Sequence, residues 1–156
     1  MESLARRLVR RISKKKVGKE TTPSDLDRRR MEALENALDK WVKAKGYHRP
    51  HRTVNETAGE LGTDGVQLHH YFQERMHVDF RTWRTRLRLE EAKRLLLEEP
   101  ETTAAEIARR VGFSNRSNFS HQFLASTGLT PAQWRKEART SPDVQAPNDY
   151  ECLTKD

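Results

Sequence analysis

The sequence is poor in cysteine and has no long apolar run. A single cysteine, Cys152, excludes an internal disulfide and a cysteine-based zinc site. The longest run of leucines covers only residues 95–97, far short of the roughly 18 apolar residues of a membrane helix. No apolar segment typical of a secretion signal occurs at the N-terminus, where Arg and Lys are frequent. We therefore expect a soluble, cytoplasmic protein without disulfides.

The chain also has little apolar material and no recognisable catalytic motif. Hydrophobic and charged residues each make up 34% of its 156 residues, and the mean hydropathy is -0.98, which favours one ordinary domain or two very small ones over a large core. No Ser/His/Asp set, carboxylate pair or phosphate-binding glycine loop is visible, so we expect no catalytic residues. His48, His51, His69 and His70 have no cysteine or acidic partner at ligand spacing, which predicts neither a metal site nor a cofactor.

Positive charge is concentrated at the N-terminus. The net charge is +7, and residues 1–20 hold eight of the 30 Lys and Arg against two of the 23 acidic residues. The remainder, with 22 basic and 21 acidic residues, is nearly neutral. Residues 1–23 therefore form a basic arm or linker, and three interpretations stay open: an arm that contacts DNA, a segment that binds an anionic membrane surface through residues 1–20, and a solvated linker. In a fragment of a longer protein the second would tether the chain to a membrane.

An internal repeat with a period of about fifty residues is the most informative feature. Four positions recur at a displacement of fifty and four more at fifty-one, in the same order, which indicates a duplicated unit. The first set pairs Thr53, Glu56, Ala58 and Gly62 with Thr103, Glu106, Ala108 and Gly112. The second set pairs Leu68, Phe72, Trp83 and Arg84 with Phe119, Phe123, Trp134 and Arg135. We expect both tryptophans to pack in the core.

Each copy predicts a helix-turn-helix. A Thr-x-x-Glu capping box opens a short helix, and a glycine in the left-handed conformation ends it. A second helix follows, capped by Thr63 or Asp64 in the first copy and by Ser114 or Asn115 in the second. Apolar residues four positions apart face inward in that helix. These are Leu68, Phe72 and Met76 in one copy, and Phe119 and Phe123 in the other.

Further helices surround the repeat. Residues 24–45 predict an amphipathic helix that buries Leu34, Leu38 and Trp41 and ends at Gly46. Residues 79–98 predict a long connecting helix, and Pro131 opens a short last helix. The sequence thus predicts an all-α fold of about seven helices: a domain over residues 24–138, with one helix-turn-helix at 53–76, the connecting helix at 79–98, a second helix-turn-helix at 103–127, and a disordered polar tail at 139–156.

The second copy resembles part of a known family. The residues that carry the likeness are Glu106-Ile107-Ala108, Val111-Gly112-Phe113-Ser114, Phe119-Ser120, Phe123, Gly128, Thr130-Pro131 and Trp134-Arg135. Together with Arg88-Leu89, Ala92 and Leu95-Leu96 upstream, they resemble the DNA-binding domain of AraC/XylS-type regulators. The likeness covers roughly residues 53–138. His77 departs from it, standing where the family usually has glycine, and Asn118 replaces a common aromatic residue.

The resemblance implies a bacterial transcription regulator that binds double-stranded DNA, has RNA polymerase as a second partner, works at the nucleoid and has no small-molecule pocket in this chain. A twenty-residue helix spans about 30 Å, close to the 34 Å between successive major-groove faces. Two recognition helices could therefore enter adjacent major grooves. The alternative is a protein- or membrane-interaction module, such as the cytoplasmic end of a larger sensor, that has kept the fold and lost specific DNA binding.

Helical phase and the resemblance together select the DNA-contacting residues. Those expected to read bases are Val66, Gln67, His69, His70, Gln73, Arg116, Ser117, Asn118 and His121. Those expected to contact phosphates are Thr53, Thr63, Arg81, Arg84, Arg88, Thr103 and Ser114, at helix N-termini or on a basic stripe of the connecting helix. Arg116 is the best single base reader, because its guanidinium can donate twice to a guanine edge.

Overall fold

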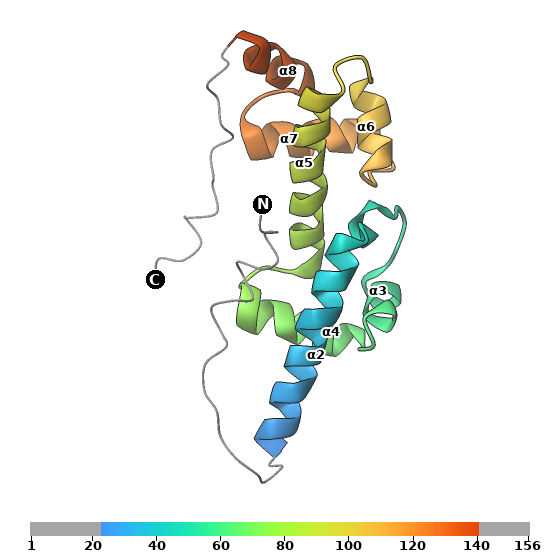
Figure 1. The fold of residues 1–156 in the computed structure, drawn as a ribbon, viewed down its shortest axis with the longest axis vertical. Helices are drawn as coiled ribbons and strands as arrows, with labels where there is room; N and C mark the ends of the chain where they lie inside the picture. The colour runs from blue at the N-terminus through green and yellow to red at the C-terminus, as the bar shows by residue number, and fades with distance from the viewer. Residues whose placement is uncertain (1–22, 141–156) are drawn as a thin grey trace. The chain divides into compact units, whose positions relative to one another are not determined.

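The computed structural model describes residues 23–140, and the predicted fold class is correct: within that range the chain forms seven α-helices and no β-strand (Figure 1). The helices are α2 (Pro23–Lys43), α3 (Val54–Glu60), α4 (Gly65–Tyr71), α5 (Phe80–Glu98), α6 (Ala104–Arg110), α7 (Arg116–Thr127) and α8 (Pro131–Thr140). Two short elements complete the set, a 3-10 turn η1 (Gly46–His48) and a π-helical turn η2 (Phe72–Met76). None of the helices in this range is long and apolar enough to cross a membrane.

The predicted helix bounds are close to those observed. Helix α2 begins at Pro23, one residue before the prediction, and α8 includes Arg139 and Thr140, which the sequence places in the tail. The remainder of the predicted basic arm, residues 1–22, and of the predicted polar tail, residues 141–156 with Cys152, lies outside the described range.

The described residues divide into two compact units, with the boundary between Arg88 and Leu89, inside α5. Unit 1 contains α2, α3, α4 and the first half of α5 around its own core. Phe72 is fully buried there, and its ring centroid lies 5.1 Å from that of Trp83. Trp83 in turn stacks on Trp41 of α2 at 6.2 Å. The predicted inward residues Leu34 and Leu38 are also buried in this core.

Unit 2 repeats this arrangement with the second half of α5, α6, α7 and α8. Phe119 and Phe123 are fully buried, and the Phe123 ring lies 5.9 Å from that of Trp134. This aromatic pair is equivalent to Phe72 and Trp83, fifty-one residues earlier. Both tryptophans are therefore packing residues, as predicted, and the sequence repeat is a repeat of structure.

The turns confirm one glycine prediction and correct another. Gly62 and Gly112 have φ values of +74° and +104°, so they end α3 and α6 in the left-handed conformation. Gly46 was expected to end α2 in the same way, but Lys45 takes the left-handed conformation instead, with φ of 55°. Glycine is required at position 46 for space, because a Cβ there would lie 2.3 Å from Nε1 of Trp41.

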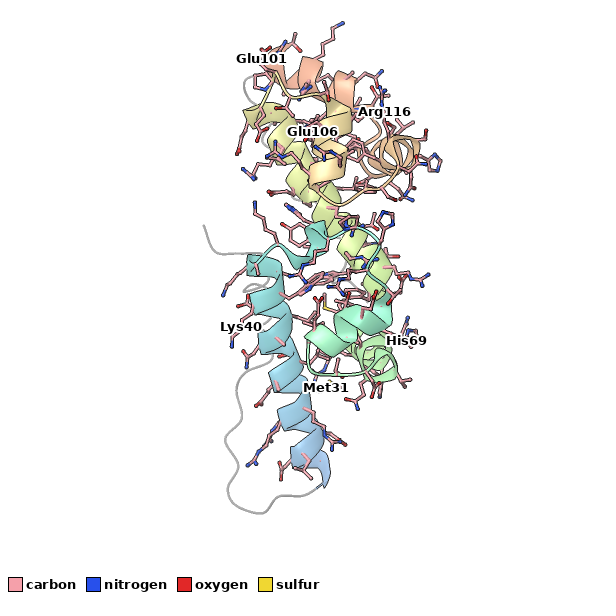
Figure 2. All side chains as sticks on the ribbon, turned by 90° about the vertical axis from the view of Figure 1, so that its right-hand side faces the viewer. Met31, Lys40, His69, Glu101, Glu106 and Arg116 are labelled. Carbon is pink, nitrogen blue, oxygen red and sulfur yellow. The ribbon has the colours of Figure 1, made fainter. Side chains whose placement is uncertain are left out.

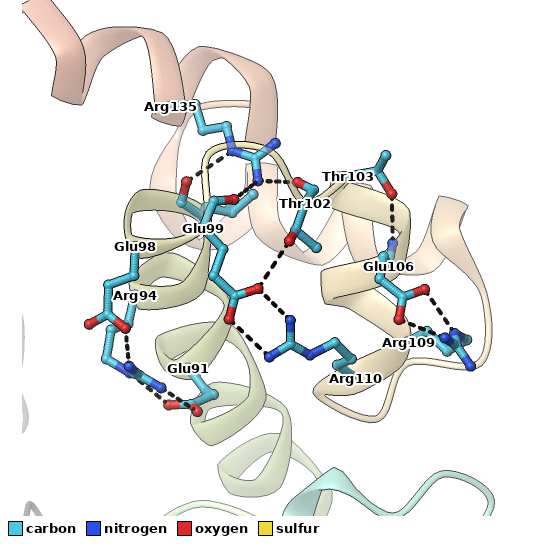
Figure 3. Close-up of polar contacts among 11 residues, drawn as sticks. Glu91, Arg94, Glu98, Glu99, Thr102, Thr103, Glu106, Arg109, Arg110 and Arg135 are labelled. Carbon is cyan, nitrogen blue, oxygen red and sulfur yellow. Dashed lines mark hydrogen bonds and ion pairs between the residues drawn. The ribbon is translucent and has the colours of Figure 1, made fainter.

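The Arg135 side chain hydrogen-bonds the backbone where α5 ends and α6 begins in unit 2 (Figure 3). Its Nε donates to the carbonyl of Leu96 at 2.9 Å, and its Nη2 donates to the carbonyls of Glu99, at 2.9 Å, and Thr102. In a continuous helix the Leu96 carbonyl would accept from the amide of residue 100, which is proline and has none. The guanidinium supplies that missing donor.

In unit 1 two arginines of α5 donate to backbone carbonyls of the segment that precedes α3. Arg88 donates from Nε to the carbonyl of Tyr47 at 2.5 Å and from Nη2 to that of Arg49 at 2.9 Å. Arg84 donates to the carbonyl of Arg52 at 2.9 Å. Arg52 and Thr102 each directly precede the residue that caps the next helix, so Arg84 and Arg135 hold the entry into a helix-turn-helix, whereas Arg88 holds η1 and the residue after it.

Candidate nucleic-acid interface

Helix α4 begins at a side-chain cap and buries one of its faces. Asp64, rather than Thr63, is the cap: its Oδ1 accepts from the Gln67 amide at 2.8 Å. Thr63 instead donates its hydroxyl to Oε1 of Gln67 at 3.1 Å. Leu68 points into the core, so residues on either side of it in the helix face solvent. Figure 2 shows His69 on this outward face.

The start of α7 has the same construction. Asn115, rather than Ser114, is the cap, and its Oδ1 accepts from the Asn118 amide at 3.1 Å. With Phe119 and Phe123 buried, the opposite side of α7 is presented to solvent, beginning with Arg116 (Figure 2). The guanidinium of Arg116 is exposed in the first turn of the helix.

All nine side chains predicted to read bases are exposed, which is a requirement for contact with a groove. On α4 and η2 they are Val66, Gln67, His69, His70 and Gln73, and on α7 they are Arg116, Ser117, Asn118 and His121. Their exposure follows from the phase of the buried residues. Their contact with DNA stays a prediction.

The prediction of a phosphate-binding stripe on α5 needs correction. Arg88 is only 9% exposed, and its guanidinium is committed to the carbonyls described above. Burial lowers its pKa to about 10, and burial also lowers the pKa of Arg84. Arg84 is half-buried, bonded to the Arg52 carbonyl and placed 5.5 Å from the Phe80 ring centroid. Of the three arginines, Arg81 alone is exposed and available for a phosphate.

The two predicted capping boxes turn out to be different. In α3 the box is complete: the Thr53 hydroxyl accepts from the Glu56 amide, and the Glu56 carboxylate accepts from the Thr53 amide at 2.8 Å. The bonds that the carboxylate accepts from the Thr53 amide and hydroxyl lower its pKa. In α6 the Thr103 hydroxyl accepts from the Glu106 amide at 3.1 Å, but the Glu106 carboxylate accepts from Arg109 instead (Figure 3). Arg109 lies one turn along the same helix and offers this carboxylate a charged donor.

These caps change the expectation for phosphate contacts at helix starts. The Glu56 carboxylate already lies against the N-terminus of α3. Thr53 is therefore a poorer binding site for a DNA phosphate than Thr103 at the N-terminus of α6. Thr63 and Ser114 precede the true caps, and their hydroxyls remain candidates only as surface groups. Within residues 23–140 no group of three or more His, Cys, Asp and Glu side chains is placed to hold a metal ion.

The π-helical turn, the burial of Tyr71 and the structural role of Arg135 were not predicted from the sequence. The first recognition helix continues into the π-helical turn η2, which ends at His77 in the left-handed conformation, with φ of 52°. The sequence did signal that strain at His77, though not the π-helical turn. Tyr71 is buried beside Phe72, and burial raises its pKa to about 12. The structural role of Arg135 had a signal, since Arg84 and Arg135 recur in the repeat.

Comparison with known proteins identifies the family of this fold. A family model described as a helix-turn-helix domain matches residues 57–137, about half of the chain. The Msm operon regulatory protein of Streptococcus mutans is 30% identical over 88 residues, which are 56% of this chain and 31% of that protein. The arabinose operon regulatory protein of Escherichia coli is 33% identical over 69 residues, which are 44% of this chain and 23% of that protein. The chain thus matches less than a third of the length of either relative.

Solved structures show the same fold. The C-terminal domain of AraT, a response regulator from Geobacillus stearothermophilus, is 28% identical with a TM-score of 0.60, covering 67% of this chain and 84% of that one. The DNA-binding domain of AdpA, a global transcriptional factor solved in complex with a target DNA, is 20% identical with a TM-score of 0.63, covering 71% of this chain and 97% of that one; this likeness concerns the fold alone. From its duplicated helix-turn-helix, its family match and these structural relatives, the chain belongs to the AraC-type helix-turn-helix family of DNA-binding domains.

Proposed function

We propose that this chain binds double-stranded DNA sequence-specifically and so controls transcription, reading bases with the outward faces of α4 and α7. One observation carries the proposal: two helices in equivalent positions of a duplicated fold each bury one side and expose predicted base readers on the other. The action is non-catalytic. It belongs at the bacterial nucleoid in the cytoplasm, with RNA polymerase as the machinery that the bound protein influences.

The side chains on the two faces suit the major groove. Arg116 offers two parallel donors, the arrangement that matches O6 and N7 of guanine. Ser117, Asn118 and His121 add donors and acceptors on the same face. Arg81 and the N-terminus of α6 at Thr103 contribute phosphate contacts that position the protein without reading sequence. Arg84 and Arg88 are left out of this interface because the fold uses them.

A selection from random duplexes at moderate salt tests the proposal. We expect enrichment of one asymmetric site of about two helical turns, because α4 and α7 carry different side chains. Replacing Arg116 with Ala should weaken binding to that site by about 1–3 kcal/mol and relax the preference at one base pair. The matched control is Arg139→Ala, which removes the same charge from an exposed position of α8.

The outcomes separate base reading from simple charge attraction. Specific reading requires Arg116→Ala to lose more affinity on the selected site than on unrelated DNA, and Arg139→Ala to lose about the same on both. Equal losses for Arg116→Ala on the two duplexes would contradict its role as a base reader. A selection that enriches no sequence at all would contradict the proposed function itself.

A further inference from the structure

Val66 is the most exposed large apolar side chain among the described residues. It is 79% exposed, whereas the other three exposed ones, Leu26, Leu97 and Leu124, reach at most 46%. A valine side chain left in water forgoes the free energy that burial against an apolar group would release. Val66 also stands on the outward face of α4, among the polar side chains of Gln67, His69 and His70. At that place an apolar group of a ligand would cover it.

The backbone around Val66 is held firmly. The Asp64 cap fixes the first turn of α4 through the Gln67 amide. On the other side α4 packs closely on α3: a Cβ at Gly65 would lie 2.0 Å from Oδ1 of Asn55. A β-branched side chain has one strongly preferred rotamer in a helix. The two methyl groups of Val66 are therefore presented in a nearly fixed position.

The major groove offers one apolar group to such a side chain. Among the groups that base pairs display there, the C5-methyl of thymine is apolar, and the rest are hydrogen-bond donors and acceptors. We propose that Val66 recognises a thymine by packing against its C5-methyl, which makes it a specificity-determining residue of the first lobe. This inference rests on the proposed function, because it names the chemistry that one position of the α4 reading face selects.

The contact implies discrimination by one methyl group. A site with thymine at the position facing Val66 buries that methyl, whereas cytosine and uracil have none to bury. The expected preference is about fourfold, which is the fold-change corresponding to about 0.8 kcal/mol for one buried methyl group. Hydrogen bonds from the polar neighbours cannot produce this preference, because uracil keeps every hydrogen-bonding group of thymine.

The test uses the full chain and the site obtained from the selection. Each thymine of that site is replaced singly by deoxyuridine, and the dissociation constant is measured for the wild-type protein, for Val66→Ala and for Val66→Thr. We expect one thymine whose replacement weakens wild-type binding about fourfold. For Val66→Ala the same replacement should have no effect, and Val66→Thr, which keeps one methyl group, should retain part of the preference. Because Val66 is exposed, thermal unfolding should show all three proteins equally folded.

A gain-of-methyl experiment completes the test. At the responsive position, a duplex carrying 5-methylcytosine should bind the wild type more tightly than one carrying cytosine, and Val66→Ala should remove that difference. The inference is overturned if no thymine responds to deoxyuridine, or if Val66→Ala weakens binding equally on thymine and uracil duplexes. Where a site is enriched and depends on Arg116, either result leaves the proposed function standing. A failure to enrich any site overturns both.

Discussion

Removal of the Arg135 guanidinium should destabilise unit 2 more than any other substitution of an arginine in that unit. Its three acceptors, the carbonyls of Leu96, Glu99 and Thr102, come from the end of α5 and the residue before the α6 cap. In Arg135→Ala the Leu96 carbonyl loses the donor that replaces the absent amide of Pro100. The start of α6 also loses its tie to α8.

The size of the effect follows from the number and kind of bonds. Hydrogen bonds to a charged group contribute about 1.5–3 kcal/mol each, but Arg135 is partly exposed, and water can replace some of what is lost. We therefore expect a loss of about 2–4 kcal/mol in the free energy of unfolding, below the additive figure for three bonds. Arg135→Lys should fall in between, because a lysine keeps the charge but lacks the planar fork needed to bond three carbonyls.

Hydrogen exchange followed peptide by peptide measures this in unit 2 alone. A loss of 2–4 kcal/mol should speed exchange in the most protected amides of α6 and α7 by roughly 30- to 900-fold. The control is Arg139→Ala on the same helix, where an exposed side chain should change stability by less than about 0.5 kcal/mol. If Arg135→Ala behaves like this control, the three carbonyl contacts do not stabilise the unit and the reasoning is refuted.

Two further predictions concern unit 1. His77→Gly should raise the free energy of unfolding by about 0.5–1 kcal/mol, because glycine adopts the left-handed conformation without the 1–2 kcal/mol that other residues lose there. A lower urea midpoint than that of the wild type would contradict this. The control is His69→Gly, inside α4, which should lower the midpoint. Tyr71 has its pKa raised to about 12, so its contribution is complete below pH 10 and is lost as the pH rises from 10 towards 12. Over that interval the wild type should lose on the order of 2 kcal/mol of stability that Tyr71→Phe retains, and parallel pH curves for the two proteins would rule out the effect.

The fold could be predicted because the sequence contains two copies of the same helical pattern. Either copy alone gives an ambiguous pattern of apolar residues, but the recurrence of Trp83 as Trp134 and of Gly62 as Gly112 fixes which residues pack and where helices end. The bounds of α2 and α8 were missed by one or two residues, since helix ends depend on local caps that propensity describes poorly. The π-helical turn was not predicted because it leaves no periodic signal in the sequence.

The sequence predicted which helix faces of the candidate interface are exposed. It did not predict which arginines of α5 are exposed. Helical phase gave the exposure of Val66 and Arg116, because the buried residues around them are strongly apolar. It could not distinguish Arg81 from Arg88, which lie on one stripe of a helix, since the difference arises from backbone carbonyls contributed by residues about forty positions away. Long-range contacts of that kind are invisible to a local pattern. The repeated Arg84 and Arg135 pair was the one available hint.

The two helix caps next to the base readers differ by one unit of charge. Asp64 precedes Gly65 and Val66, and Asn115 precedes Arg116, yet both side chains accept the same kind of amide bond. Under the proposed function, the first half of the bound site faces a fixed anion at the helix start, and the second faces a neutral amide and a cation. Ionic strength should therefore act in opposite senses at the two helix starts: added salt screens the attraction of Arg116 for the DNA, and it also screens the repulsion between Asp64 and the DNA.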